Sequence, residues 1–188
     1  MPFAINAASN HAPSGIYIAL GANQAYRGRP PLENLNSALG ALVSEGVEVA
    51  ACSRPWRTPA WPDPSDPPFI NGVARLQTDL APAALMAVLH DVEAQFGRAR
   101  GRRNAPRTLD LDLIDYRGQL NADEPGPVLP HPRACARAFV LLPLRDIAPR
   151  WRDPASGASL DRLIAALPLA DRSACRPAGG VLCAVRAG

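Results

Sequence analysis

Residues 106–116 read Pro-Arg-Thr-Leu-Asp-Leu-Asp-Leu-Ile-Asp-Tyr, and the rest of the chain is organised around them. Three leucines alternate with Asp110 and Asp112, which predicts a β-strand with the leucines on one face and both carboxylates on the other. Carboxylates two residues apart on a strand lie about 7 Å apart and repel each other unless a cation lies between them. Mg²⁺ would remove this repulsion, since it commonly binds one or two carboxylates together with substrate phosphates. The alternative is a half-exposed strand with solvated aspartates.

The segment just before this strand carries a dense positive charge. Arg98 to Arg107 contains five arginines in ten residues and no acidic residue. Like charges repel, so such a run tends to stay flexible until it meets a counter-ion, and the planar guanidinium matches phosphate oxygens. An arginine loop that leads into a paired-aspartate strand therefore predicts a polyphosphate site. A solvated surface loop and a nucleic-acid patch are the alternatives.

The composition is that of an ordinary globular protein. The chain has 188 residues, which suits one domain, and it is 47% hydrophobic and 20% charged. A net charge of +3 is too small to indicate nucleic-acid binding by itself. All 20 basic residues are arginine. The lack of lysine excludes a Walker-A phosphate loop and lysine Schiff-base chemistry.

Cysteine spacing and hydropathy argue against a zinc site, a signal peptide and a membrane span. The four cysteines are widely scattered and form no Cys-x-x-Cys pair, so we expect no zinc site. No apolar run approaches 18 residues, and residues 1–30 lack the pattern of a signal peptide. We therefore expect a cytoplasmic protein with reduced thiols and no membrane association.

The order of the predicted elements indicates the fold class. Hydrophobic periodicity predicts strands at 15–20, 47–57, 69–77 and 106–116, and helices at 31–43, 82–96, 134–144 and 160–167. Strand–helix–strand–strand–helix–strand is the order of the ferredoxin-like split βαβ unit. We therefore predict an α+β fold with an antiparallel-rich sheet flanked by helices. The predicted organisation is an N-terminal extension (1–14), a single domain (15–170) and a peripheral C-terminal tail (171–188).

Several short motifs together resemble one enzyme family. They comprise residues 17–23 (Tyr-Ile-Ala-Leu-Gly-Ala-Asn), 57–59 (Arg-Thr-Pro), 69–71 (Phe-Ile-Asn), 97–116, 130–133 (Pro-His-Pro-Arg) and 137–141 (Arg-Ala-Phe-Val-Leu). This set is similar to that of the 6-hydroxymethyl-7,8-dihydropterin pyrophosphokinases of folate biosynthesis, over about residues 15–149. The resemblance implies transfer of pyrophosphate from ATP to the hydroxymethyl group of the reduced pterin, with release of AMP.

The resemblance also implies roles for individual residues. It implies two Mg²⁺ ions, which Asp110 and Asp112 would ligate. The implied catalytic residues are Arg98, Arg100, Arg107, Asp110 and Asp112. The implied ATP contacts are Glu93, Arg98, Arg103, Arg107, His131 and Arg137. The implied pterin contacts are Thr58, Pro59, Ala60, Phe69, Asn71, Asp110 and Phe139. On this interpretation the partners are two small molecules, ATP and the pterin, and we expect a monomer that binds no nucleic acid.

Two other functions are compatible with parts of the pattern. A ferredoxin-like nucleic-acid-binding module could use the arginine loop, but it would leave Asp110 and Asp112 repelling the phosphates unless a metal were present. A two-metal nuclease would need further carboxylates beside that pair. Asp115 does not meet that need on sequence grounds, because strict alternation places it on the opposite face of the strand.

Overall fold

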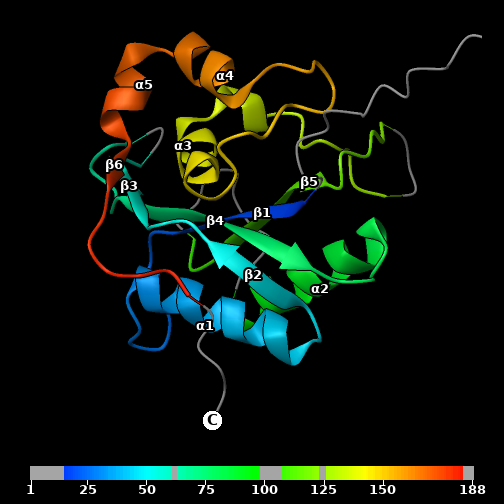
Figure 1. Ribbon diagram of the computed structural model, residues 1–188. Helices are drawn as coiled ribbons and strands as arrows, with labels where there is room; N and C mark the ends of the chain where they lie inside the picture. Colours follow the sequence, from blue (N-terminus) through cyan, green and yellow to red (C-terminus); the bar gives the residue numbers. More distant parts are fainter. Residues whose placement is uncertain (1–14, 61–62, 98–106, 123–125, 184–188) are drawn as a thin grey trace, which may run out of the picture.

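The computed structural model describes residues 15–60, 63–97, 107–122 and 126–183. Within these residues, six strands form one sheet, and helices cover both of its faces (Figure 1). The strands are β1 (Ile16–Ala22), β2 (Glu48–Cys52), β3 (Trp56–Thr58), β4 (Phe69–Gln77), β5 (Asp110–Tyr116) and β6 (Arg176–Pro177). The helices are α1 (Pro31–Ser44), α2 (Pro82–Gln95), the short 3-10 helix η1 (Ala134–Ala136), α3 (Ala138–Ile147), α4 (Leu160–Ala166) and α5 (Leu169–Ala174).

The sheet has the topology that the sequence predicts. Its strand order is β5-β1-β4-β3-β6, β2 pairs with β4 beside β3, and every pair is antiparallel. The units β1-α1-β2 and β4-α2-β5 interlock so that β4 lies between β1 and β2 and β1 lies between β4 and β5. The predicted α+β fold with a split βαβ core is therefore confirmed.

The predicted strand at 47–57 is wrong in one respect, because it is two strands. β2 pairs with the C-terminal half of β4, and β3 pairs with its N-terminal end. Between β2 and β3, Ser53 makes two hydrogen bonds to Val73 of β4. Its backbone N–H donates to the Val73 carbonyl (2.9 Å), and its Oγ accepts from the Val73 N–H (3.1 Å). Pro55 has no N–H to continue the ladder.

One face of the sheet packs against α1 and α2. The buried leucines of these helices meet the inward residues of β1, and the predicted leucine face of β5 lies here, with Leu111 and Leu113 buried in the same cluster. Both helices begin with a proline, whose missing N–H costs nothing at a helix start.

The opposite face packs against α3, and α4 and α5 lie on the same side of the sheet (Figure 1). Here the sequence prediction of a helix at 134–144 is shifted. Residues 134–136 form a 3-10 turn, Arg137 is extended (φ −124°, ψ 113°), and α3 runs from Ala138 to Ile147. The extended backbone at Arg137 accompanies a contact between its side chain and Asp112 on β5. The helix predicted at 160–167 is confirmed by α4.

Residues 171–183, expected to be peripheral, are part of the fold. β6 pairs with β3, and Leu182 is only 3% exposed. Gly72 in β4 leaves a notch that Leu182 fills, because a Cβ at Gly72 would lie 2.3 Å from Leu182 Cδ2. The Asn36 amide of α1 accepts from the Cys183 N–H (3.0 Å) and donates to the Val181 carbonyl (3.1 Å). None of the described helices is long and apolar enough to cross a bilayer.

Candidate active site

Four strands bring two of the predicted site residues, Asp110 and Asn71, into one row at one end of the sheet. Asp110 on β5 lies opposite Gly21 on β1, Gly21 lies opposite Asn71 on β4, and Asn71 lies opposite Trp56 on β3. Since neighbouring strands lie about 4.8 Å apart, the backbones of Asp110 and Asn71 are separated by about 10 Å. The row faces the α3 side of the sheet, because Trp56 belongs to the core on that side.

Gly21 lets the Asn71 amide lie close to the β1 backbone. A Cβ at Gly21 would lie 3.1 Å from Asn71 Oδ1 and 3.9 Å from Phe69 Cδ1. The missing side chain therefore makes room for the Asn71 amide beside the Asp110 strand. The predicted strand ends at residue 20, whereas in the structure β1 continues to Ala22 and includes Gly21.

The predicted pterin residues of β3 and β4 lie together. Asn71 Nδ2 donates to Thr58 Oγ1 (2.9 Å), and Thr58 lies opposite Phe69 across the two strands. Ala60 is buried two residues further on, and Pro59 is exposed between them. Phe139 comes from the first turn of α3, so it belongs to a different element.

The two carboxylates of β5 each lie beside positive groups. Asp110 Oδ2 accepts a short hydrogen bond from Arg107 Nη1. Asp112 Oδ2 lies 3.5 Å from Arg137 Nη1 and 3.9 Å from His131 Nε2. Both carboxylates remain partly exposed, at 20% and 34% of their side-chain surface. Two partly exposed carboxylates on one face, surrounded by cations, are a donor set suited to a hard divalent cation.

Asn23 fixes the point where the arginine segment meets β5. Its Oδ1 accepts from the Arg107 N–H (2.7 Å), and its own N–H donates to the Arg107 carbonyl (2.9 Å). Its Nδ2 donates to the Pro67 carbonyl (3.0 Å), so the same amide also holds the backbone just before β4. Sequence reasoning missed this role. The available signal was a short polar side chain directly after a buried strand.

His131 and Arg137 form a second group around Asp112. Burial lowers the pKa of His131, Arg137 and Arg133 lower it further, and Asp112 opposes them. His131 is therefore mostly neutral at pH 7. The Arg137 guanidinium also lies 5.3 Å from the centre of the Phe139 ring, so Arg137 links the carboxylate on β5 to the aromatic ring at the start of α3.

Glu93 has a structural position. It is 4% exposed on α2, and its Oε1 accepts from the Leu111 N–H of β5 (2.7 Å). This bond ties the helix before the arginine segment to the strand after it. Contact between Glu93 and nucleotide stays a prediction.

A β-bulge overturns the expected orientation of Asp115. The β1–β5 register pairs Tyr17 with Asp115 but Ile18 with Leu113, so Ile114 is an extra residue. The bulge reverses the alternation and puts Asp115 on the same face as Asp112. Its carboxylate nevertheless accepts from Trp151 Nε1 (2.7 Å) and the Gly118 N–H (2.8 Å). Burial raises the pKa of Asp115, with Asp153 adding to the rise.

Three of the predicted site residues, Arg98, Arg100 and Arg103, lie outside the described residues. Two shallow hollows occur elsewhere on the described surface. One lies at the opposite end of the sheet, near Arg75 and Arg117, and the other lies beside β2 and Leu182. Neither is lined by a predicted site residue. Burial raises the pKa of the Cys52, Cys135 and Cys175 thiols to about 11, so these three are poor nucleophiles at neutral pH.

Comparison with known proteins identifies the family. The family model described as 7,8-dihydro-6-hydroxymethylpterin-pyrophosphokinase (HPPK) matches residues 17–149, which include all the site residues discussed above. The chain belongs to the 7,8-dihydro-6-hydroxymethylpterin-pyrophosphokinase family. This membership favours the first sequence interpretation over the nucleic-acid-binding module.

Individual relatives agree with this membership. A Pseudomonas aeruginosa protein is 43% identical over 155 residues, covering 81% of this chain and 91% of its own length. A Synechocystis sp. protein is 41% identical over 151 residues, covering 80% and 74%. Both are named 2-amino-4-hydroxy-6-hydroxymethyldihydropteridine pyrophosphokinase. The Plasmodium falciparum HPPK-DHPS crystal structure with pteroate shares the fold, with a TM-score of 0.60 at 12% identity over 80% of this chain and 43% of that one.

Proposed function

We propose that the chain transfers the pyrophosphoryl group of ATP to the hydroxymethyl group of 6-hydroxymethyl-7,8-dihydropterin. The pterin hydroxyl oxygen forms a bond to the β-phosphorus of ATP, the bond from that phosphorus to the α–β bridging oxygen breaks, and AMP leaves with that oxygen. The hydroxyl proton passes to solvent. The supporting observation is the single row in which Asp110 and Asn71 lie on either side of Gly21, with Thr58 hydrogen-bonded to Asn71.

Asp110 and Asp112 are proposed to hold Mg²⁺ together with the triphosphate. Mg²⁺ binds through one or two carboxylates plus phosphate oxygens, and when bound it neutralises charge on the phosphates. Arg107 and Arg137 already lie beside these carboxylates, and each would exchange part of that contact for a phosphate oxygen. Phosphoryl transfer needs mainly positioning and charge stabilisation, which guanidinium groups provide.

The pterin is proposed to lie near Gly21, between Asp110 on β5 and Asn71 on β4. A flat heterocycle needs apolar faces and a few polar groups at its edge. Phe69 and Phe139 would supply the faces, and Asn71 and Thr58 would supply hydrogen bonds at the edge. Pro59 and Ala60 would close one side of the slot.

The arginine segment is proposed to complete the nucleotide site. Arg98, Arg100 and Arg103 would contact phosphates, with His131 and Glu93 near the nucleotide. Since arginine-rich segments close over anions, we expect this segment to exclude water when ATP is bound. We also propose that the enzyme acts as a monomer in the cytoplasm, a reducing compartment that suits its four free cysteines.

An assay of AMP formation tests this function. The purified chain is incubated with ATP, MgCl₂ and 6-hydroxymethyl-7,8-dihydropterin, and the nucleotides are separated by chromatography. We expect AMP and the pterin diphosphate in equal amounts, and no product with EDTA or with the 6-methyl analogue, which lacks the accepting hydroxyl. Formation of ADP in place of AMP, or no turnover with these substrates, would contradict the proposal.

A further inference from the structure

We propose that Asp146, acting through Trp56, is a positioning residue for the pterin slot. It fixes the short strand β3, which carries Thr58, against α3, which carries Phe139. This inference rests on the proposed function, because the slot is defined by the pterin that it would hold. Neither Asp146 nor Trp56 is among the site residues predicted from the sequence, although Trp56 lies in the same row as Asn71.

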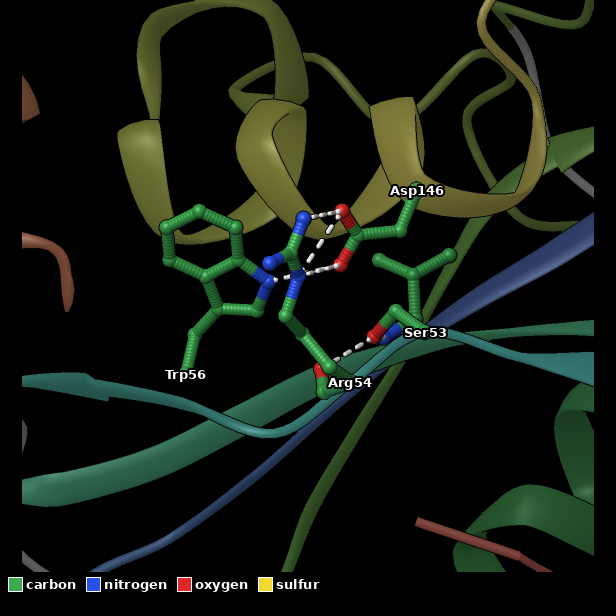
Figure 2. A network of polar contacts seen from close by, with 5 residues as sticks. Ser53, Arg54, Trp56 and Asp146 are labelled. Carbon is green, nitrogen blue, oxygen red and sulfur yellow. Dashed lines mark hydrogen bonds and ion pairs between the residues drawn. The ribbon is translucent and has the colours of Figure 1, made fainter. Parts of the chain in front are cut away.

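The contacts of Asp146 join α3 to the segment that leads into β3 (Figure 2). Its Oδ2 accepts from Trp56 Nε1 at 2.9 Å. Arg54 also donates to both carboxylate oxygens, through Nη2 at 2.9 Å and Nε at 3.1 and 3.2 Å. The Arg54 guanidinium in turn lies 5.4 Å from the centre of the Trp56 indole ring. The three side chains therefore form a closed group.

Burial shows which of these contacts matters more. Trp56 is 6% exposed and the Asp146 side chain 14%, whereas the Arg54 side chain is 59% exposed. An exposed ion pair contributes little, while a buried indole N–H that loses its acceptor keeps an unmet desolvation cost. The Trp56–Asp146 bond is therefore the main link, and Arg54 supports it from the solvent side.

The link matters because β3 has little else to hold it. It is three residues long, it pairs with β4 and with the two-residue β6, and Pro59 follows it directly. Trp56 lies opposite Asn71, and Thr58 receives its hydrogen bond from the same Asn71. A shift of Trp56 would therefore move both polar groups that we assign to the pterin edge.

The Trp56–Asp146 hydrogen bond also fixes the position of the C-terminal end of α3. This helix is about 15 Å long, since it has ten residues. Arg137, just before its first residue, contacts Asp112 on β5, and Asp146 near its end contacts Trp56 on β3. α3 is thus held at both ends across the sheet. The position of Phe139, which we assign to the pterin slot, depends on the contacts that hold α3, and the Asp146 contact is the one that lies away from the carboxylate pair.

Three substitutions test the inference. Asp146→Ala removes the acceptor, Trp56→Phe removes the indole N–H and keeps a smaller aromatic ring, and Asp146→Asn keeps an oxygen that can still accept from Trp56. Arg54→Met is the matched control, because it breaks the exposed ion pair and leaves the Trp56–Asp146 bond. Values of kcat and of KM are measured separately for ATP and for the pterin, well below the melting temperature of each variant.

We expect D146A and W56F to raise the KM for the pterin about five- to tenfold, the scale of one or two lost hydrogen bonds, with the KM for ATP within about twofold of wild type. D146N and R54M should stay within about twofold for both substrates. An unchanged pterin KM in D146A and W56F, or an equal rise for both substrates, overturns the positioning role. A wild-type chain that forms no AMP overturns the proposed function instead.

Amide hydrogen exchange gives a second reading that needs no substrate. We expect faster exchange at residues 56–58 and 138–141 in D146A and W56F than in R54M, with exchange in β1 unchanged. Equal exchange in all variants overturns the coupling of β3 to α3, whatever the activity assay shows.

Discussion

At the scale of single residues, Asp110 and Asp112 carry the chemistry that we propose. Asp110→Asn or Asp112→Asn should lower kcat by at least about 10²- to 10³-fold, the usual effect of removing one preorganised charge-stabilising group. Stability should change little, because the ion pairs of these carboxylates are partly exposed. AMP formation and the melting temperature are the two measurements. Near-wild-type turnover in either variant would contradict the metal-binding role.

Substitution of Gly21 tests the position that we propose for the pterin. Gly21→Ala places a Cβ 3.1 Å from Asn71 Oδ1, so the Asn71 amide that we assign to the pterin edge must shift. We expect the KM for the pterin to rise about tenfold while the KM for ATP is unchanged. Gly179→Ala is the control, since a Cβ there meets nothing within 4 Å. Equal pterin KM values for the two variants would show that the ring does not lie near Gly21.

Sequence reasoning finds residues whose chemistry is visible locally. Asp110 and Asp112 stand out because they alternate with leucines, and Asn71 and Thr58 stand out through short motifs. Gly21 and Asn23 do not, because their roles depend on what two other strands and a loop bring to them. A glycine that follows a run of apolar strand residues is compatible with a turn as well as with a further residue of the strand.

At the scale of elements, the bulge in β5 creates a buried carboxylate with a measurable pH dependence. Because the pKa of Asp115 is raised in the folded chain, its protonated form is favoured there. The stability from this group is present below its unfolded pKa, about 3.9, and is lost as the pH rises through the folded pKa. Wild type should therefore lose stability relative to Asp115→Asn as the pH rises from about 4 to 7.

Urea unfolding of both proteins across this range checks the sign. The quantity compared is the difference in free energy of unfolding, wild type minus variant. Trp151→Phe is a second test, because it removes the hydrogen bond that lowers the pKa of Asp115 and keeps a smaller aromatic ring in the core. A difference that stays constant with pH, or that grows in favour of wild type, would contradict the raised pKa.

Element boundaries show where periodicity stops being informative. Alternation predicts β5 but assigns Asp115 to the wrong face, since one inserted residue at Ile114 changes the register against β1. The break between β2 and β3 is hidden for a similar reason. A serine side chain at position 53 takes over a backbone pairing that local propensity cannot reveal.

At the scale of the whole molecule, the C-terminal segment is predicted to contribute to global stability. Leu182→Ala should lower the free energy of unfolding by about 2–4 kcal/mol, because it empties the notch at Gly72. Val181→Ala is the control, since that side chain is 68% exposed. Chemical denaturation of both variants gives the comparison. Equal stabilities would mean that Leu182 is not anchored in the core.

The split βαβ core is more predictable from the sequence than the helices α3–α5 and the strand β6. The order of strands and two amphipathic helices is enough for the split βαβ core and for the leucine face of β5. The α3–α5 layer and β6 are harder, because they are short and their positions follow from contacts such as Asp146 with Trp56 and Leu182 with Gly72.

The hydrogen bond from the Cys183 N–H to the Asn36 side chain joins residues 147 positions apart. A chain emerging from the ribosome exposes α1 and the β4 notch long before Leu182 is made. The notch at Gly72 of β4 therefore stays unfilled, and its apolar lining stays open to chaperones, until Leu182 has left the exit tunnel. Residues 176–183 can pack against β3, β4 and α1 only after those elements have been synthesised.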